Sequence, residues 1–156
     1  MLLDLRGLEE LARGTAGMIR PGDAVLLTGD LGAGKSVFAR ALLRELGVEG
    51  DIPSPSFIVD AEYASRGLSI HHVDLYRLGG GAFELEAFGI LDLLASDSVA
   101  IVEWADRLPE GAARSGFRVA LGFTRDPLVR EVGFERFGLA GDRHDPEAGF
   151  RGSPGG

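Results

Sequence analysis

The chain has 156 residues, with 24 acidic against 16 basic side chains, a formal net charge of −8 and no cysteine. Its length suits one domain with a core of its own, and the missing cysteines exclude disulfides, thiolate nucleophiles and cysteine-bound zinc. The acidic balance argues against a protein that grips a nucleic-acid backbone by itself, so any RNA would be held by a partner.

The beginning of the chain predicts a cytoplasmic protein that starts with a helix. Met1–Asp4 lacks the basic and apolar segments of a signal peptide, and no apolar run reaches the ~20 residues that cross a bilayer. We therefore expect no membrane association. Apolar residues recur at helical spacing from Leu8 to Ala16, which predicts a first helix that ends near Pro21-Gly22.

The next segment carries the most specific motif of the sequence. Ala24–Thr28 is an apolar run of strand length, and Val37–Leu46 predicts an amphipathic helix that Gly47 stops. Between them lies a full match to the G-x-x-x-x-G-K-[ST] phosphate-binding loop, formed by Gly29, Asp30, Leu31, Gly32, Ala33, Gly34, Lys35 and Ser36. Strand, loop and helix stand in the order that this motif requires.

The chemistry of this loop predicts that it binds ATP with Mg²⁺. Its glycines allow successive backbone N–H groups to turn around phosphate oxygens at the positive N-terminal end of a helix. Lys35, the only lysine beside fifteen arginines, is a compact charge that can reach between β- and γ-phosphates. Ser36 offers its hydroxyl to the metal ion.

A stiff connector and two strand-like segments follow. The connector Asp51–Ser56 contains two prolines, which fix φ and disfavour helix. Phe57–Tyr63 and Leu68–Tyr76 are strand-like, and residues 64–67 between them predict a hairpin turn. Part of the sheet is therefore expected to be antiparallel.

The middle of the chain predicts short helices and a buried strand. Apolar residues within Phe83–Leu94 predict one or two helices interrupted near Gly89. Val99–Val102 is a continuous apolar run, as expected of a strand that is buried on both faces.

The last predicted element is a second hairpin. Phe117–Phe123 and Val129–Phe137 alternate and predict two strands joined through residues 124–127. We expect a P-loop ATPase domain over residues 1–138 and a disordered tail over residues 139–156, where Gly, Pro and charge replace periodicity. These elements predict the α/β fold of P-loop NTPases, in three layers, with a mixed sheet and antiparallel hairpins at its margins.

Two carboxylates are candidates for chemistry at the loop. Glu103 directly follows the buried strand, and ligands gather at the carboxyl ends of strands in open α/β sheets, so we predict that it holds Mg²⁺ with Ser36. The alternative is that Glu103 is only the first solvated residue after the strand. Asp74 either orients or deprotonates the attacking water or caps the following turn through Tyr76 or Arg77, and both interpretations stay open.

Histidine, tryptophan and arginine side chains complete the candidates. His72 shares a strand face with Asp74 and is either a packing histidine or a direct participant. Trp104 is either a core or rim residue or a contact surface for a partner. Arg130 and Arg77 either reach the nucleotide or are surface charges.

Several motifs, taken in order, resemble one family. They are the phosphate loop, Ser54-Pro55-Ser56-Phe57, His72–Leu78, Glu84–Ile90 and Val102-Glu103-Trp104. Together they resemble the TsaE (YjeE) ATPases, which serve the synthesis of threonylcarbamoyladenosine (t6A) in bacterial tRNA. The phosphate loop alone would not single out this family, whereas the later blocks in order do.

The resemblance implies roles for individual residues. The residues concerned are the ATP cradle 31–36, the catalytic Lys35, the Mg²⁺ holders Ser36 and Glu103, the essential acid Asp74 and the late nucleotide contact Arg130. The segment around Leu5 and Arg6 would lie beside the adenine.

The resemblance also implies an activity and partners. It implies a P-loop ATPase that converts ATP and water to ADP and phosphate, slowly by itself and dependent on partners. Similar proteins pair with the TsaB and TsaD subunits, the second of which transfers threonylcarbamoyl to adenosine 37 of tRNAs that read codons beginning with A. The tRNA would be contacted only indirectly.

The sequence departs from the family pattern at a few positions. Ser36 and Ser56 stand where the family usually has threonine, which keeps each hydroxyl and removes a methyl group. Glu103-Trp104 is followed by Ala105-Asp106 rather than the more frequent proline. We expect function to survive both serine changes, whereas the absent proline leaves the shape of the loop after Glu103 open without affecting the carboxylate.

Two other functions stay open from the residues alone. A small-molecule P-loop kinase would need a lid and an acceptor pocket, and the sequence has no arginine-rich lid segment. A non-hydrolysing nucleotide-sensing module would use only binding energy to switch a partner, with Asp74 in a structural role.

Overall fold

The strand β2 (Ala24–Thr28), the apolar run before the phosphate loop, is the central strand of the sheet. It lies between β5 (Val99–Glu103) and β6 (Gly116–Phe123) and runs parallel to both, so the carboxyl ends of β2 and β5 meet at one edge. The computed structural model describes residues 1–55, 58–79 and 81–138. Within this part of the chain the strand order is β1-β7-β6-β2-β5-β4-β3.

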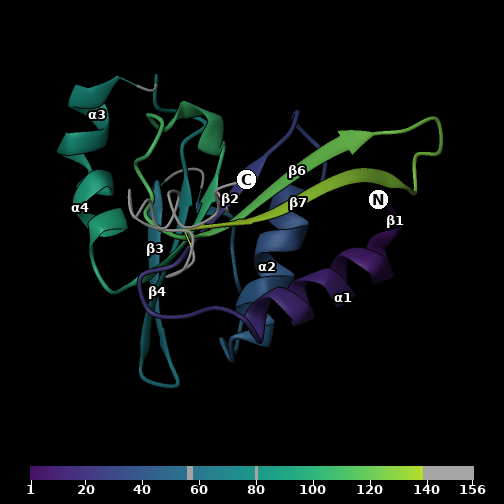
Figure 1. The fold of residues 1–156 in the computed structure, drawn as a ribbon, viewed down its shortest axis with the longest axis horizontal. Coiled ribbons are helices and arrows are strands. Elements are labelled where there is room, and N and C mark those ends of the chain that lie inside the picture. The colour runs from purple at the N-terminus through teal and green to yellow at the C-terminus, as the bar shows by residue number, and fades with distance from the viewer. Residues whose placement is uncertain (56–57, 80, 139–156) are drawn as a thin grey trace, which may run out of the picture.

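Antiparallel hairpins flank the parallel centre, as predicted. β3 (Asp60–Ser65) and β4 (Leu68–Asp74) form one margin, where β4 also runs parallel to β5. β6 and β7 (Arg130–Phe137) form the other hairpin, which extends as a long arm in Figure 1. The short β1 (Leu2–Leu3) pairs with β7, and the sequence did not predict it because two residues are too few for an alternating pattern.

The first hairpin differs from the prediction at its start. β3 begins at Asp60 rather than at residue 57, because Val59 has a φ of +67° and breaks the extended backbone. Residues 56 and 57 lie outside the described part of the chain, as does the predicted tail, residues 139–156. The turn is Arg66-Gly67, whose φ angles of +52° and +76° suit a tight hairpin.

Helices cover both faces of the sheet and complete the three layers of a P-loop NTPase fold. α1 (Leu5–Ala16) and α2 (Lys35–Glu45) pack on one face, and α3 (Ala82–Ala87) and α4 (Ile90–Ala95) pack on the other (Figure 1). Gly89, with a φ of +68°, separates α3 from α4 as predicted.

The first helix starts earlier and ends earlier than its apolar pattern predicts. It begins at Leu5, because the side chain of Asp4 accepts a hydrogen bond from the Gly7 N–H at 2.8 Å and caps the helix. It ends at Ala16, before the predicted stop at Pro21.

Two apolar cores hold the layers together, one on each face of the sheet. The core under α1 and α2 includes Leu8, Val25, Leu27, Phe38, Leu42, Ile101 and Phe117. The core under α3 and α4 includes Val73, Leu85, Ile90, Leu94, Ala100 and Val102. All five residues of β5 are buried, whereas Leu26 and Thr28 of β2 are half-buried.

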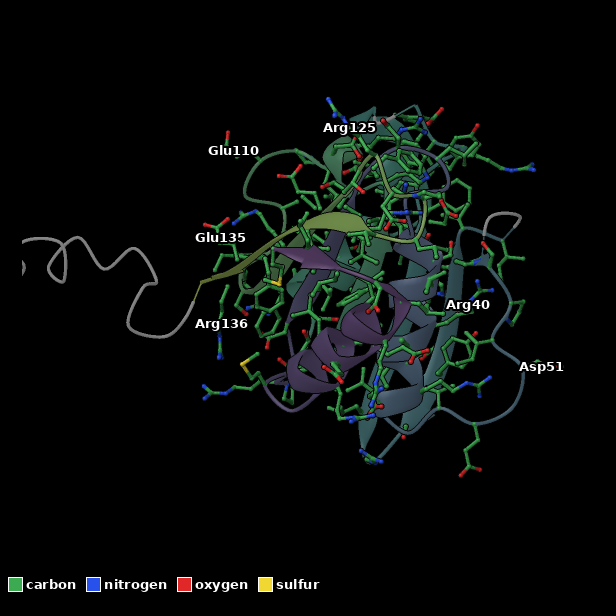
Figure 2. The ribbon with its side chains drawn as sticks, turned by 90° about the vertical axis from the view of Figure 1, so that its right-hand side faces the viewer. Arg40, Asp51, Glu110, Arg125, Glu135 and Arg136 are labelled. Carbon is green, nitrogen blue, oxygen red and sulfur yellow. The ribbon has the colours of Figure 1, made fainter. Side chains whose placement is uncertain are left out.

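Many charged side chains lie at the surface of the fold. Glu110, Arg125 and Glu135, for example, extend away from the ribbon in Figure 2. No helix in residues 1–55, 58–79 and 81–138 combines the length and the apolar character that a membrane crossing needs.

Candidate active site

The phosphate loop joins the carboxyl end of β2 to the N-terminus of α2, as the sequence predicts. Gly29 and Gly34 have φ angles of +142° and +112°, in the region that favours glycine. A Cβ at Gly29 would also overlap the carbonyl oxygen of Leu121 on β6. The loop therefore lies close against β6, along a path that larger residues could not follow.

Lys35 folds its ammonium group back into the loop. Its Nζ donates hydrogen bonds to the carbonyl oxygens of Gly29 and, at 2.9 Å, of Asp30. The same nitrogen lies 4.0 Å from the centroid of the Trp104 ring, within the range of a cation–π interaction. Burial lowers the pKa of Lys35, while nearby carboxylates, Glu103 first, act against this effect. The single lysine of the chain therefore places its ammonium group directly at the phosphate loop.

Ser36, Glu103 and His72 form a chain of hydrogen bonds behind the loop. Ser36 Oγ donates to Glu103 Oε1 at 2.6 Å, and His72 Nε2 lies 2.6 Å from Glu103 Oε2. Glu103 is 2% exposed and His72 is fully buried. Glu103 is therefore not the solvated residue of the alternative interpretation, and it meets Ser36 where the prediction places it.

Glu103 is buried as a carboxylate. Burial alone would raise the pKa of this group, but hydrogen bonds from His72 and Ser36 and the charge of Lys35 outweigh it, so that the pKa of Glu103 lies below its ordinary value. An ionised oxygen ligand beside a phosphate loop is the group that a hard divalent cation prefers.

Asp74 ends β4 beside Glu103, and the two residues are in register across the parallel strands β4 and β5. Its side chain is buried, and its Oδ1 accepts a hydrogen bond from the Tyr76 N–H at 2.9 Å. This is the turn-capping contact that the sequence left open. The same side chain lines the pocket in front of the loop, so the cap does not prevent contact with a ligand there.

A pocket of about 410 Å³ lies in front of the loop. Its lining brings together predicted site residues from three segments of the chain, with Trp104 beside them. These residues are Leu31, Gly32, Gly34, Lys35, Ser36, Asp74 and Glu103. A larger groove of about 810 Å³ lies elsewhere, between the 105–113 segment and strands β2, β6 and β7, and contains none of these residues. The smaller pocket is therefore the candidate active site.

The donors in this pocket fit Mg²⁺ only together with a nucleotide. Across the described ranges, no group of three or more histidine, aspartate or glutamate side chains could hold a metal ion by itself. Mg²⁺ is usually held by one or two protein oxygens together with waters and substrate phosphates. The hydroxyl of Ser36 and the carboxylate of Glu103 offer such oxygens. The phosphate loop beside them would bind the nucleotide phosphates that complete the coordination of Mg²⁺.

Comparison with known proteins identifies the family. The family model described as threonylcarbamoyl adenosine biosynthesis protein TsaE matches residues 3–127. The chain belongs to the TsaE family. The resemblance seen in the ordered sequence motifs is thereby confirmed.

TsaE relatives cover most of the chain. The tRNA threonylcarbamoyladenosine biosynthesis protein TsaE of Streptomyces coelicolor is 42% identical over 131 residues, which are 80% of this chain and 87% of that protein. The TsaE protein of Bacillus subtilis is 32% identical over 128 residues, 82% of this chain and 78% of that protein. The crystal structure of Bacillus subtilis YdiB superposes with a TM-score of 0.64 at 27% identity, covering 86% of this chain and 83% of that chain.

Arg130, the late nucleotide contact that the TsaE resemblance implies, lies against the loop rather than in the pocket lining. Its Nε donates to the Ala33 carbonyl at 3.0 Å, and its guanidinium lies 5.0 Å from the centroid of the Phe123 ring. The arginine that lines the pocket is Arg77. Arg130 therefore supports the loop backbone, and its contact with a nucleotide stays a prediction.

The expected adenine contacts of the TsaE family, Leu5 and Arg6, open α1. This helix passes beside the loop, since a Cβ at Gly34 would lie 3.8 Å from Leu8 Cδ1. Arg6 is exposed and pairs with Glu10 at 3.7 Å. Their role in binding adenine likewise stays a prediction.

Arg107 is a positioning group in this TsaE chain that the sequence did not single out. It ends the short 3₁₀ helix η2 (Ala105–Arg107). The two hydrogens of its Nη1 are shared among three carbonyl oxygens of the turn after β4, those of Leu75, Tyr76 and Leu78. It therefore ties the segment that follows Glu103 to the one that follows Asp74, a contact for which the sequence carries no local signal.

Proposed function

We propose that this chain binds and hydrolyses ATP as its Mg²⁺ complex and is required to form the threonylcarbamoyl group on adenosine 37 of tRNAs that read ANN codons. In this proposal it acts on a complex of the TsaB and TsaD subunits. The observation that carries the nucleotide chemistry is the 2.6 Å contact between Ser36 Oγ and Glu103 Oε1 beside the phosphate loop. Membership of the TsaE family supports the link to tRNA modification.

Different groups of the chain bind the phosphates and the metal ion at the loop. Backbone N–H groups of residues 31–36 and the start of α2 cradle the phosphates, and Lys35 places its charge against the β- and γ-phosphates. Ser36 and Glu103 would hold Mg²⁺, which when bound neutralises negative charge on those phosphates. This arrangement fixes the terminal phosphate relative to the end of β4.

Asp74 acts on the attacking water in this proposal. It lies in register with Glu103 and lines the same pocket. Its Oδ1 is used by the Tyr76 N–H, which fixes the orientation of the carboxylate. Its carboxylate orients the attacking water in line with the terminal phosphate or accepts its proton.

The proposed hydrolysis is slow in the isolated chain and faster in a complex. P-loop ATPases gain most of their rate from positioning and from positive charge on the phosphates, often from an arginine. Only one arginine, Arg77, is found in the described lining of the pocket. A partner that reorders Arg77 or adds a cation of its own would complete the site.

Two features support an indirect role in tRNA modification, namely the negative net charge of the chain and the absence of an acyl-carrying nucleophile from the proposed site. With a net charge of −8 the chain is not suited to hold tRNA directly, so the partner subunits hold it. The proposed site uses no covalent nucleophile that would carry an acyl group. Hydrolysis therefore resets the shared complex between cycles rather than driving the acyl transfer.

One observation favours the sensing module as the second candidate. The contact between Asp74 Oδ1 and the Tyr76 N–H is the structural role that this alternative assigns to Asp74. In that case nucleotide binding would switch a partner without turnover.

A phosphate-release assay without any acceptor separates these functions. The chain is mixed with the TsaB and TsaD subunits and Mg²⁺·ATP, and wild type is compared with Asp74→Ala and Glu103→Ala. The proposal predicts release by wild type, stimulation by the partners and strong loss in both variants. Unchanged rates in both variants would remove the assigned roles, and binding without release would favour the sensor. ADP formation without free phosphate, and only after an acceptor is added, would indicate a kinase.

A further inference from the structure

His72 is a buried polar residue that the proposed hydrolysis does not use. It lies on β4, two residues before Asp74, and its ring is fully buried. Its Nε2 lies 2.6 Å from Glu103 Oε2 on the neighbouring strand β5. Its Nδ1 is buried and has no hydrogen-bond partner within the described ranges.

The hydrogen-bond chemistry determines which nitrogen carries the proton. A carboxylate only accepts hydrogen bonds, so the ring nitrogen that faces Glu103 must be the donor. Nδ1 has no hydrogen-bond partner in the part of the chain that the structure describes. The 2.6 Å contact with Glu103 therefore requires a proton on Nε2.

The two oxygens of Glu103 face different parts of the protein. Oε2 is tied to His72 in the interior, while Oε1 faces Ser36, whose Oγ lies 2.6 Å away. Ser36 is the first residue after Lys35 and the other proposed Mg²⁺ holder. Because His72 holds Oε2, the oxygen that faces the loop and the proposed metal position is Oε1.

We propose that His72 is a positioning residue that holds Oε2 of Glu103 so that Oε1 is aimed at the metal beside Ser36. This inference rests on the proposed function, in which Glu103 is a Mg²⁺ ligand. Mg²⁺ demands near-ideal octahedral geometry at short distances, so a small rotation of a ligating carboxylate weakens its binding. Groups that orient a ligand in this way typically change metal affinity by about 10- to 100-fold when they are removed.

A merely structural role for His72 makes a different prediction. Ile70 on the same face of β4 belongs to the core under α2, so a residue of similar size without a donor could fill the position of His72 equally well. If volume were all that mattered, His72→Leu would keep the metal affinity. If the donor matters, His72→Gln, whose amide N–H can replace the Nε2–H, should keep it and His72→Leu should lose it.

The test measures Mn²⁺ binding to the ADP-loaded protein by electron paramagnetic resonance, with Mn²⁺ standing in for Mg²⁺. The variants are His72→Leu, His72→Gln, Glu103→Gln and the control His71→Gln. His71 neighbours His72 but bonds Asp60 at 2.9 Å, outside the proposed site. We expect wild-type affinity in His71→Gln, near-wild-type affinity in His72→Gln, and about 10- to 100-fold weaker Mn²⁺ binding in His72→Leu, with metal-free ADP affinity unchanged.

The outcomes separate this inference from the proposed function. Loss of Mn²⁺ affinity in Glu103→Gln but not in His72→Leu overturns the role of His72 alone, and so does equal loss in His72→Leu and His72→Gln. Full affinity in Glu103→Gln overturns the metal role of Glu103 itself, and the inference with it. Should His72→Leu fail to fold, ¹⁵N NMR of the wild-type imidazole decides, because a ring protonated on Nδ1 and not on Nε2 would contradict the hydrogen bond to Glu103.

Discussion

The ammonium nitrogen of Lys35 lies 4.0 Å from the ring centroid of Trp104, the only tryptophan of the chain. The two residues come from the first turn of α2 and from the residue after β5, and Trp104 adopts a φ of +59° to present its ring there. The contact couples the phosphate loop to an intrinsic optical probe.

Nucleotide binding should therefore change tryptophan emission. Phosphates compete with the loop carbonyls for the Lys35 ammonium and draw it away from the ring, which alters the polarity around Trp104. The measurement is a fluorescence titration with ADP beside calorimetric titration of the same sample. Trp104→Phe should bind without an optical signal, and binding by wild type with no spectral change would contradict the coupling.

The close approach of the loop to β6 predicts that Gly29→Ala impairs both folding and binding. The new Cβ would overlap the Leu121 carbonyl at a φ of +142°, a combination expected to cost more than about 1 kcal/mol of unfolding free energy and to displace the loop. Urea unfolding and ADP titration measure the two effects.

Gly14→Ala is the matched control for this substitution. Gly14 lies inside α1, and within the described part of the chain a Cβ added there would meet nothing within 4 Å. Replacing an exposed helical glycine by alanine should stabilise the fold by about 0.5–1 kcal/mol. Equal changes in unfolding free energy and ADP affinity for Gly29→Ala and Gly14→Ala would contradict the close contact between the loop and β6.

The depressed pKa of Glu103 predicts a pH-dependent contribution to stability. The folded protein favours the ionised form of this carboxyl more than the unfolded chain does. Its contribution to stability is therefore present above the ordinary pKa of 4.5 and is lost as the pH falls through the lower pKa of the folded state. The difference in unfolding free energy between wild type and Glu103→Gln should shrink across that acidic range in urea titrations. A difference independent of pH from neutrality down to strong acid would refute it.

Arg107 should stabilise the fold more than a surface arginine does. Its bonds to the Leu75, Tyr76 and Leu78 carbonyls are charged hydrogen bonds, so Arg107→Ala should lower the free energy of unfolding by about 1.5–3 kcal/mol. Arg118, paired with Glu135 at 3.6 Å on the surface, is the control and should change it by less than about 1 kcal/mol when replaced by alanine. Similar losses in both variants would count against the tie between the two turns.

Local sequence signals were sufficient where one residue type determines the backbone. The glycines of the phosphate loop and Gly89 stand where the chain needs a positive φ, and the apolar runs of β2 and β5 predict buried strands. The start of β3 was predicted wrongly because the positive φ of Val59 is unusual for a β-branched residue, so nothing in its type indicates a break.

Contacts between distant segments were harder to predict. Alternation along β4 puts His72 and Asp74 on one face, but it does not say that β5 is the neighbour that brings Glu103 to them. The pairing of Ser36 with Glu103 was predicted because a phosphate loop calls for a metal partner, a chemical rather than a geometric argument. Arg107 had neither a pattern nor a motif to point to it.

The most direct test of the account is calorimetric titration of ADP into the chain with and without Mg²⁺. Mg²⁺ should strengthen ADP binding by wild type about tenfold or more, because a contact to a charged ligand contributes ~1.5–3 kcal/mol. Glu103→Gln should lose this gain while keeping metal-free binding, and Lys35→Ala should weaken binding under both conditions. An undiminished Mg²⁺ gain in Glu103→Gln, or wild-type affinity in Lys35→Ala, would contradict the account.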